Sequence, residues 1–96
     1  MNTMLNEITV RIPTPLRGLT QNKEVVYVSG KTIKELLLNL ESQCPGILNR
    51  ICNEKGEIRR FVNVYLNGED IRFLNGLDTP LQQRDEVSIV PAIAGG

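Results

Sequence analysis

Apolar and polar residues alternate in the first part of the chain. Ile8, Val10 and Ile12 alternate with polar residues, and a second segment of similar character follows at 24–28. A period of two residues puts every second side chain on the same face, so each segment predicts a half-buried strand. Prolines close the first strand, and residues 16–23 predict a loop. The two strands should therefore form a hairpin with a long connection.

The spacing of apolar residues then changes to that of a helix. Thr32 and Glu35 have the spacing of a capping box, in which a threonine hydroxyl accepts from the amide three residues later. The apolar residues after this start recur at helical intervals and form one stripe, made of Ile33, Leu36, Leu37 and Leu40. Pro45-Gly46 ends the helix. This is the main helix that the sequence predicts.

The second half of the chain predicts further short elements. Residues 47–51 favour one short turn of helix, and 60–66 form the longest strand candidate. Asn67-Gly68 predicts a tight hairpin, because both residues tolerate positive φ. Ile71 is expected on the returning strand, with Phe73 as its possible extension. The last strand covers 86–90.

The predicted order is strand, strand, helix, strand, short strand, strand. One amphipathic helix cannot bury its apolar stripe alone, so it should pack across one face of a mixed sheet. This is an α+β fold of the β-grasp (ubiquitin-like) type. With 96 residues, the chain predicts one β-grasp domain at 1–90 and a flexible C-terminal tail at 91–96.

Composition narrows the possible functions. The chain is 41% hydrophobic and 23% charged, and its eleven basic residues balance eleven acidic ones. A net charge of zero gives no field for a phosphate backbone, so nucleic acid is not an expected partner. No apolar run approaches a membrane span, and no signal-peptide pattern opens the chain, so we expect a cytoplasmic protein. Histidine is absent, and Cys44 and Cys52 form no metal-binding pattern, so no bound metal is expected.

The C-terminal residues are unusually slim. Pro91, which cannot donate to a sheet ladder, is followed by Ala92, Ile93, Ala94, Gly95 and Gly96. Such a tail spans roughly 20 Å at most and suits insertion into a narrow channel of another protein. An inert, frayed terminus is the simpler interpretation.

Chemistry at the terminal carboxylate would need help from another protein. The group is ionised at neutral pH and is a poor electrophile until it is activated, for example by transfer of AMP from ATP. Gly30-Lys31-Thr32 resembles the end of a phosphate-binding loop, but that motif needs a glycine where Val25 stands. We therefore assign Thr32 to helix capping and expect the activating enzyme to be a separate partner.

These features together resemble the ThiS/MoaD family of ubiquitin-like sulfur carriers. The resemblance rests on the tail from Val90 to Gly96, on Asn67-Gly68 and on the segment 85–89. Within the family, the chain is most similar to the CysO branch, which serves cysteine synthesis. Segments that carry this likeness are Ile12-Pro13-Thr14, Leu16-Arg17, Thr20, 60–67 and 69–73.

The resemblance implies a reaction cycle at Gly96. A ubiquitin-activating-enzyme-like adenylyltransferase would use Mg-ATP to adenylate the glycine, and a sulfurtransferase would convert it to a thiocarboxylate. A cysteine synthase that uses pyridoxal phosphate would accept the sulfur, and a zinc metalloprotease would release cysteine. The chain itself would bind no cofactor and would not be an enzyme.

Partner docking is expected on the sheet face opposite the helix. If Val62 and the alternate residues after it point inward, Phe61, Asn63 and Tyr65 point outward, beside Val90. A partly apolar exposed patch of this kind is a reasonable docking surface. The alternative is that the aromatic rings only shield the sheet or pack under the long loop.

Other functions fit the same sequence. The chain could be the small subunit of molybdopterin synthase, which shares the terminal motif. It could also be a ubiquitin-like modifier that is conjugated to lysines of other proteins, or a β-grasp binding module with an inert tail. A stand-alone enzyme is disfavoured, since the sequence contains no recognisable nucleophile–base pair.

Overall fold

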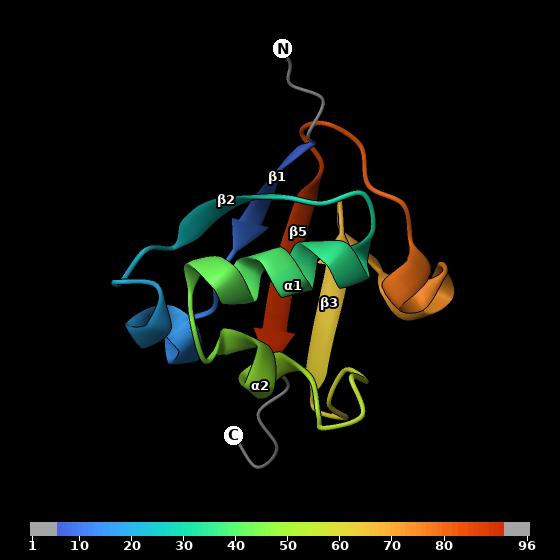
Figure 1. Cartoon of the computed structure of the whole chain (residues 1–96). Helices are drawn as coiled ribbons and strands as arrows, with labels where there is room; N and C mark the ends of the chain where they lie inside the picture. The colour runs from blue at the N-terminus through green and yellow to red at the C-terminus, as the bar shows by residue number, and fades with distance from the viewer. Residues whose placement is uncertain (1–5, 92–96) are drawn as a thin grey trace.

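The computed structural model describes residues 6–91 and has two layers, a sheet and the helices that cover one of its faces (Figure 1). The regular elements within those residues, where η denotes a 3-10 helix, are β1 Glu7–Arg11, η1 Thr14–Leu19, β2 Val25–Ser29, α1 Ile33–Gln43, α2 Ile47–Ile51, β3 Val62–Leu66, β4 Glu69–Asp70, η2 Ile71–Phe73, η3 Gly76–Asp78 and β5 Glu86–Pro91. The predicted order of strands and main helix is confirmed.

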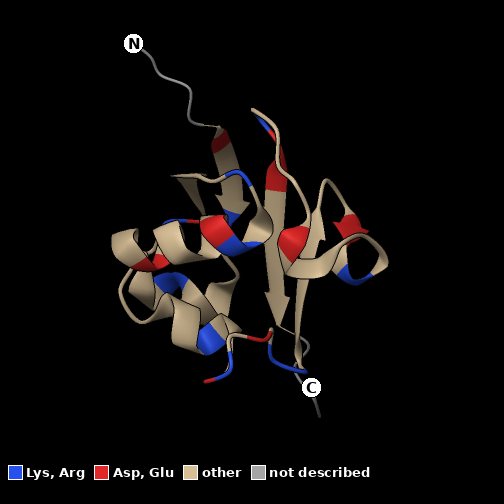
Figure 2. Cartoon of the chain, turned by 45° about the vertical axis from the view of Figure 1, so that its right-hand side comes forward, with Lys and Arg blue, Asp and Glu red and all other residues tan. Residues whose placement is uncertain are grey.

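The five strands form one mixed sheet in the order β2-β1-β5-β3-β4. The central pair, β1 and β5, is parallel, and every other neighbouring pair is antiparallel. This arrangement under one main helix is a β-grasp fold, as predicted. Strand β5 lies between β1 and β3, so the chain reaches Pro91 from the interior of the sheet. Figure 2 shows the sheet and helices from a second direction.

The core lies between the sheet and α1. Leu66, the last of the predicted inward residues of β3, is only partly buried. The other predicted inward residues of the strands and the predicted stripe of α1 are buried, including Ile8, Val10, Val26, Val28, Ile33, Leu36, Leu37, Leu40, Val64, Val87 and Ile89. Gly30 is the close-contact point between layers, because a Cβ there would lie 2.8 Å from the Cα of Leu36. The capping prediction also holds, since Thr32 Oγ1 accepts from the Glu35 amide at 3.2 Å. The Glu35 carboxylate reaches back to the amide of Lys31 at 2.8 Å.

Helix α1 also protects an edge of the sheet. Strand β2 is an outer strand, and the outer strands of a sheet expose unpaired carbonyls that attract other strands. Asn39 Nδ2 donates to the carbonyl of Ser29, and Gln43 Nε2 donates to that of Tyr27, each at 2.9 Å. These polar residues of α1 are thus bonded to the backbone of β2.

The prediction of a loop at 16–23 is wrong for the first half of that segment, because Thr14–Leu19 forms the 3-10 helix η1. Pro15 lies in its first turn, where the fixed φ of proline is already helical and its missing amide is not needed. Leu16 is buried in the core and anchors the turn. Short 3-10 turns carry too few residues to show a period in the sequence.

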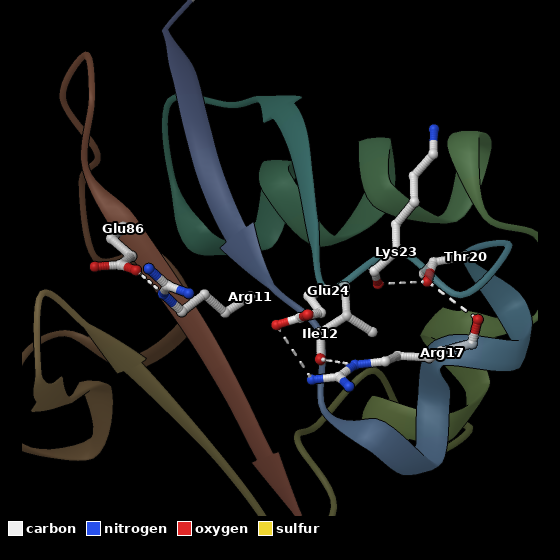
Figure 3. Close-up of polar contacts among 7 residues, drawn as sticks. All are labelled: Arg11, Ile12, Arg17, Thr20, Lys23, Glu24 and Glu86. Atoms are coloured by element: carbon white, nitrogen blue, oxygen red, sulfur yellow. Dashed lines mark hydrogen bonds and ion pairs between the residues drawn. The ribbon is translucent and has the colours of Figure 1, made fainter.

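Side-chain contacts hold the rest of this connection in place (Figure 3). Arg17 Nε donates to the carbonyl of Ile12 at 3.1 Å, and its Nη2 lies 4.0 Å from the Glu24 carboxylate. The buried Thr20 hydroxyl lies 3.2 Å from the Arg17 carbonyl and 2.9 Å from that of Lys23. Arg17 and Thr20, which contribute to the resemblance to the CysO branch, therefore have structural contacts in this loop.

Two expectations for the second half of the chain need correction. The strand predicted at 60–66 begins only at Val62, whose amide closes a turn to the Arg59 carbonyl at 3.0 Å. The returning strand does not include Ile71 or Phe73, because β4 stops at Asp70. The Asp70 side chain caps η2 by accepting from the Arg72 amide at 2.9 Å, and this local bond replaces the sheet ladder.

Glu41 joins α1 to α2. Its Oε2 accepts from the Gly46 amide at 3.0 Å and its Oε1 from the Leu48 amide at 2.8 Å. These backbone hydrogen bonds, that of Gly46 first, stabilise the charged form and lower the pKa of the Glu41 carboxyl from its ordinary value of 4.5. The bonds predict a pH-dependent contribution to stability.

We expect Glu41→Gln to be less stable than the wild type at neutral pH. A lowered folded-state pKa means that the carboxylate stabilises the fold above the unfolded-state pKa, and that this contribution is lost as the pH falls through the folded-state value. The difference in urea midpoint between the two proteins should therefore shrink between about pH 7 and about pH 3. Glu54→Gln, at an exposed loop position, is the control and should show little difference at either pH. A difference for Glu41→Gln that does not change with pH would contradict this role.

Candidate carrier site and docking face

The candidate site begins where β5 ends. Pro91 pairs with Val62 of β3, so the sheet includes one residue more than the predicted last strand. The predicted carrier residue Gly96 and the predicted insertion residues Ala92, Ile93, Ala94 and Gly95 lie outside the described residues. What the structure defines is their anchor, a half-buried proline at the end of a central strand.

Three of the four predicted docking residues, Phe61, Asn63 and Val90, lie at the end of the sheet where the tail begins, and Tyr65 lies farther along β3, opposite Ser88. Asn63 is paired with Val90 across β3 and β5, and the alternate residues Val62 and Val64 are buried. Asn63 and Tyr65 are half-buried. Phe61 is 55% exposed and Val90 41% exposed, although both are large apolar side chains. We call Phe61, Asn63, Tyr65 and Val90 the docking face. The alternative in which Phe61 packs under a loop is not supported by its exposure.

A polar network borders the docking face and was not predicted. Arg72 Nη2 lies 3.2 Å from Asp70 Oδ2 and also donates to the side-chain oxygen of Asn63. The hydrogen bond from the Arg72 amide, followed by the bond from its side chain, lowers the pKa of the Asp70 carboxyl. Arg72 lies in the η2 turn that follows β4, and from there its side chain contacts Asn63 of β3. The Asp-x-Arg spacing, typical of a side chain that caps its own turn, was the available signal.

Farther along the same face, the sheet surface becomes polar. Arg11 of β1 forms an ion pair with Glu86 of β5 (Figure 3). Pairing places Arg11 opposite Ser88, and Ser88 in turn is opposite Tyr65. Two exposed apolar side chains, Phe61 and Val90, thus lie toward the end of β5 where the tail begins, and Tyr27 of β2 is exposed farther along the sheet.

The described residues contain no evident machinery for catalysis. Residues 6–91 hold no group of three or more acidic, cysteine or histidine side chains that could bind a metal ion. Cys44 and Cys52 are both buried, and desolvation is the main cause that raises the pKa of each thiol, which favours the unreactive protonated form. None of the helices within the described residues is long and apolar enough to cross a membrane.

Comparison with known proteins identifies the family to which the chain belongs. The model of the ThiS family matches residues 10–96. The sulfur carrier protein CysO of Mycobacterium tuberculosis (strain ATCC 25618 / H37Rv) is 43% identical over 91 residues, which are 93% of this chain and 98% of that protein. The small archaeal modifier protein 3 of Haloferax volcanii is 38% identical, over 94% of this chain and 99% of that protein.

A solved structure of a similar protein superposes closely on this chain. A chain in the crystal structure of the Amycolatopsis orientalis BexX/CysO complex superposes with a TM-score of 0.87 at 42% identity, over 93% of this chain and 99% of that one. The fold and the matches define a ubiquitin-like sulfur carrier protein, which is not itself an enzyme. The chain belongs to the ThiS family, with CysO proteins among its similar relatives.

Proposed function

We propose that the chain carries sulfur as a thiocarboxylate on Gly96 and donates it for cysteine biosynthesis in the cytoplasm. The observation that supports this most strongly is the family match, which extends to Gly96 through a small-residue tail anchored by the central strand β5. The likeness to CysO proteins over nearly their whole length supports the choice of cysteine.

Activation would take place on a partner. A carboxylate oxygen of Gly96 attacks the α-phosphorus of ATP, releases pyrophosphate and forms the glycyl adenylate. A persulfide of a sulfurtransferase then attacks the carbonyl carbon, and AMP leaves. A thiol next cleaves the S–S bond of the resulting acyl disulfide, forms a disulfide with the sulfurtransferase cysteine and releases the terminal group as –COSH. A ubiquitin-activating-enzyme-like adenylyltransferase supplies Mg-ATP, and the sulfurtransferase supplies the sulfur. When the carboxylate is held in the partner's site, its effective concentration next to ATP is much higher than in free solution.

The docking face is the proposed contact with that adenylyltransferase. Its two exposed apolar side chains, Phe61 and Val90, lie next to the start of the tail, so binding there would place Pro91 and the residues after it at the entrance of a channel. Apolar side chains in the centre of an interface contribute most of its binding energy. The crystal structure of the Amycolatopsis orientalis BexX/CysO complex supports a carrier that binds another protein.

We expect Val90→Asp to lower the rate of adenylation by roughly tenfold or more, because it buries a charge in the centre of the proposed interface. Position 90 is exposed, so the fold should survive the change. Pyrophosphate release with the adenylyltransferase of the host organism measures the effect. Leu38→Asp is the matched control, since Leu38 is 51% exposed on α1, in the layer opposite the docking face. Equal losses in both variants would argue against a specific docking face.

The sulfur acceptor would be an aminoacrylate that a pyridoxal-phosphate-dependent cysteine synthase forms from phosphoserine. The thiocarboxylate sulfur adds to its β-carbon, the acyl group moves to the amine, and a zinc metalloprotease cleaves the cysteinyl adduct. The test is to mix the chain carrying ³⁵S-thiocarboxylate with host extract and O-phosphoserine. Label in cysteine supports the proposal. Label in a molybdopterin dithiolene would instead assign the chain to molybdopterin synthase as its small subunit.

A second candidate function is protein modification. The likeness to a small archaeal modifier protein, at 38% identity, favours it specifically. In that case the Gly96 carbonyl would form an isopeptide bond with a lysine amine of another protein. Higher-mass species on a denaturing gel, sensitive to removal of Gly96 and resistant to thiol reductants, would reveal this activity.

A further inference from the structure

Positive charge gathers at the end of the molecule where the tail begins. The segment 50–60 holds four of the chain's eleven basic side chains but only two of its eleven acidic ones. This segment leads directly into β3, and the first residue of β3, Val62, is paired with Pro91 at the end of β5. Arg59 and Arg60 therefore lie within three residues of the position opposite Pro91. Figure 2 shows the basic segment at this end of the sheet.

The packing of α2 brings a third arginine to the same place. The Arg59 amide donates to the Ile51 carbonyl at 2.9 Å, and Arg59 Nε donates to the Asn49 carbonyl at 3.0 Å. Both contacts hold Arg59 against α2, which carries Arg50 in its last turn. We call Arg50, Arg59 and Arg60 the exit patch.

Among residues 6–91, no acidic side chain forms an ion pair with the exit patch. The ion pairs found among residues 6–91 join Arg11 to Glu86, Arg17 to Glu24 and Arg72 to Asp70. None of them involves the three exit-patch arginines, and all three are exposed. A cluster of like charges with no internal partner adds self-repulsion to the folded state, so its use lies in what it attracts.

The opposite end of the central strands carries the opposite charge. Glu7 begins β1, and Asp85 and Glu86 lie at the start of β5; Arg84 is next in the chain, and Arg11 forms an ion pair with Glu86. Figure 2 shows acidic segments at the end of the sheet away from the C-terminus. A chain of zero net charge is thus polarised along β5, which orients it in the field of a charged partner.

We propose that the exit patch docks on acidic side chains around the channel entrance of the activating partner and turns the carrier tail-first toward it. This inference rests on the proposed function. Protein carboxylates are the chosen ligand because the five residues beyond Pro91 would span about 17 Å when extended, which places ATP phosphates at Gly96 beyond the reach of the patch. The patch is distinct from the docking face, whose contribution is apolar contact.

The test is Arg59→Glu/Arg60→Glu, assayed by pyrophosphate release with the host adenylyltransferase. Electrostatic attraction acts mainly on encounter, so kcat/KM should fall by roughly tenfold or more at low salt while kcat stays unchanged. The loss should shrink when ionic strength rises from about 0.05 M to about 0.5 M, because salt screens exposed charges. Lys31→Glu/Lys34→Glu makes the same charge change on the helix side and should alter kcat/KM by less than about twofold at the same ionic strengths.

A second variant guards against a folding defect. The Arg60 side chain makes no hydrogen bond or ion pair within residues 6–91, so Arg60→Glu removes no internal contact and should still lower kcat/KM by several-fold. Unchanged kcat/KM in both exit-patch variants, or a loss equal to that of the lysine control, would overturn the inference while leaving the proposed function intact. Failure of the wild-type chain to be adenylated at all would overturn both.

Discussion

Removal of Gly96 yields a folded chain that acquires no thiocarboxylate. This is the expected result because the deletion leaves a carboxylate one residue short of the partner's reactive centre, while the nearest described residue, Pro91, keeps its place in the sheet. Positioning errors of a single residue, about 3.5 Å, move the reacting atoms out of attack distance. The readout is the mass of the C-terminal peptide after incubation with Mg-ATP, host adenylyltransferase and a sulfur donor.

A matched control separates loss of the carrier residue from loss of the fold. Deletion of Met1-Asn2 shortens the other end of the chain and should leave thiocarboxylate formation unchanged. The melting temperature of both truncated chains should equal that of the wild type. Sulfur transfer that persists without Gly96 would mean that the acyl group lies elsewhere, and the proposed mechanism would then be wrong.

Replacement of Gly30 by alanine should have the largest effect on stability of any single methyl group added at a described glycine. The new Cβ would lie 2.8 Å from both the backbone nitrogen and the Cα of Leu36. These atoms belong to the backbone of α1, which cannot move aside as a side-chain tip can. Overpacking of this kind typically costs about 1–3 kcal/mol. For a domain of this size the melting temperature should fall by about 5–15 °C.

Gly18→Ala is the control for this substitution. A Cβ at Gly18 meets nothing within 4 Å, and its φ lies outside the left-handed region, so the change should be neutral or slightly stabilising. Urea unfolding of the two variants gives the free-energy difference. Equal stability of Gly30→Ala and Gly18→Ala would contradict the close approach of α1 to the residue that follows β2.

Elements with a repeated apolar pattern were predictable from the sequence, and short elements were not. The alternation at Ile8 and Val10 and the helical stripe that starts at Ile33 extend over enough residues to specify a period. Asp70 shows why a shorter element failed: one side-chain hydrogen bond to the Arg72 amide decides between a strand and a 3-10 turn. Such a choice depends on local geometry that a hydrophobic pattern does not encode.

The candidate site likewise contains residues that the sequence predicted and residues that it did not. Strand alternation correctly placed Asn63 and Val90 together on an outward face, because side-chain direction in a strand follows residue parity. The exit patch was missed, since Arg50 and Arg59 belong to segments that meet only when α2 packs beside the turn before β3. The sulfur acceptor could not be predicted from the surface residues of this chain, because in the proposed function a partner enzyme forms the acceptor.

The most direct test of the central claim is the mass of the C-terminal peptide of the protein isolated from its host. Cleavage after Arg84 releases residues 85–96, which contain neither methionine nor cysteine. Replacement of one carboxyl oxygen by sulfur adds about 16 Da at the activated glycine, and oxidation of Met or Cys cannot imitate that gain in this peptide. A gain confined to Gly96 and lost after hydrolysis is the predicted result. A peptide that keeps its encoded mass in cells engaged in cysteine synthesis would contradict a sulfur-carrying Gly96.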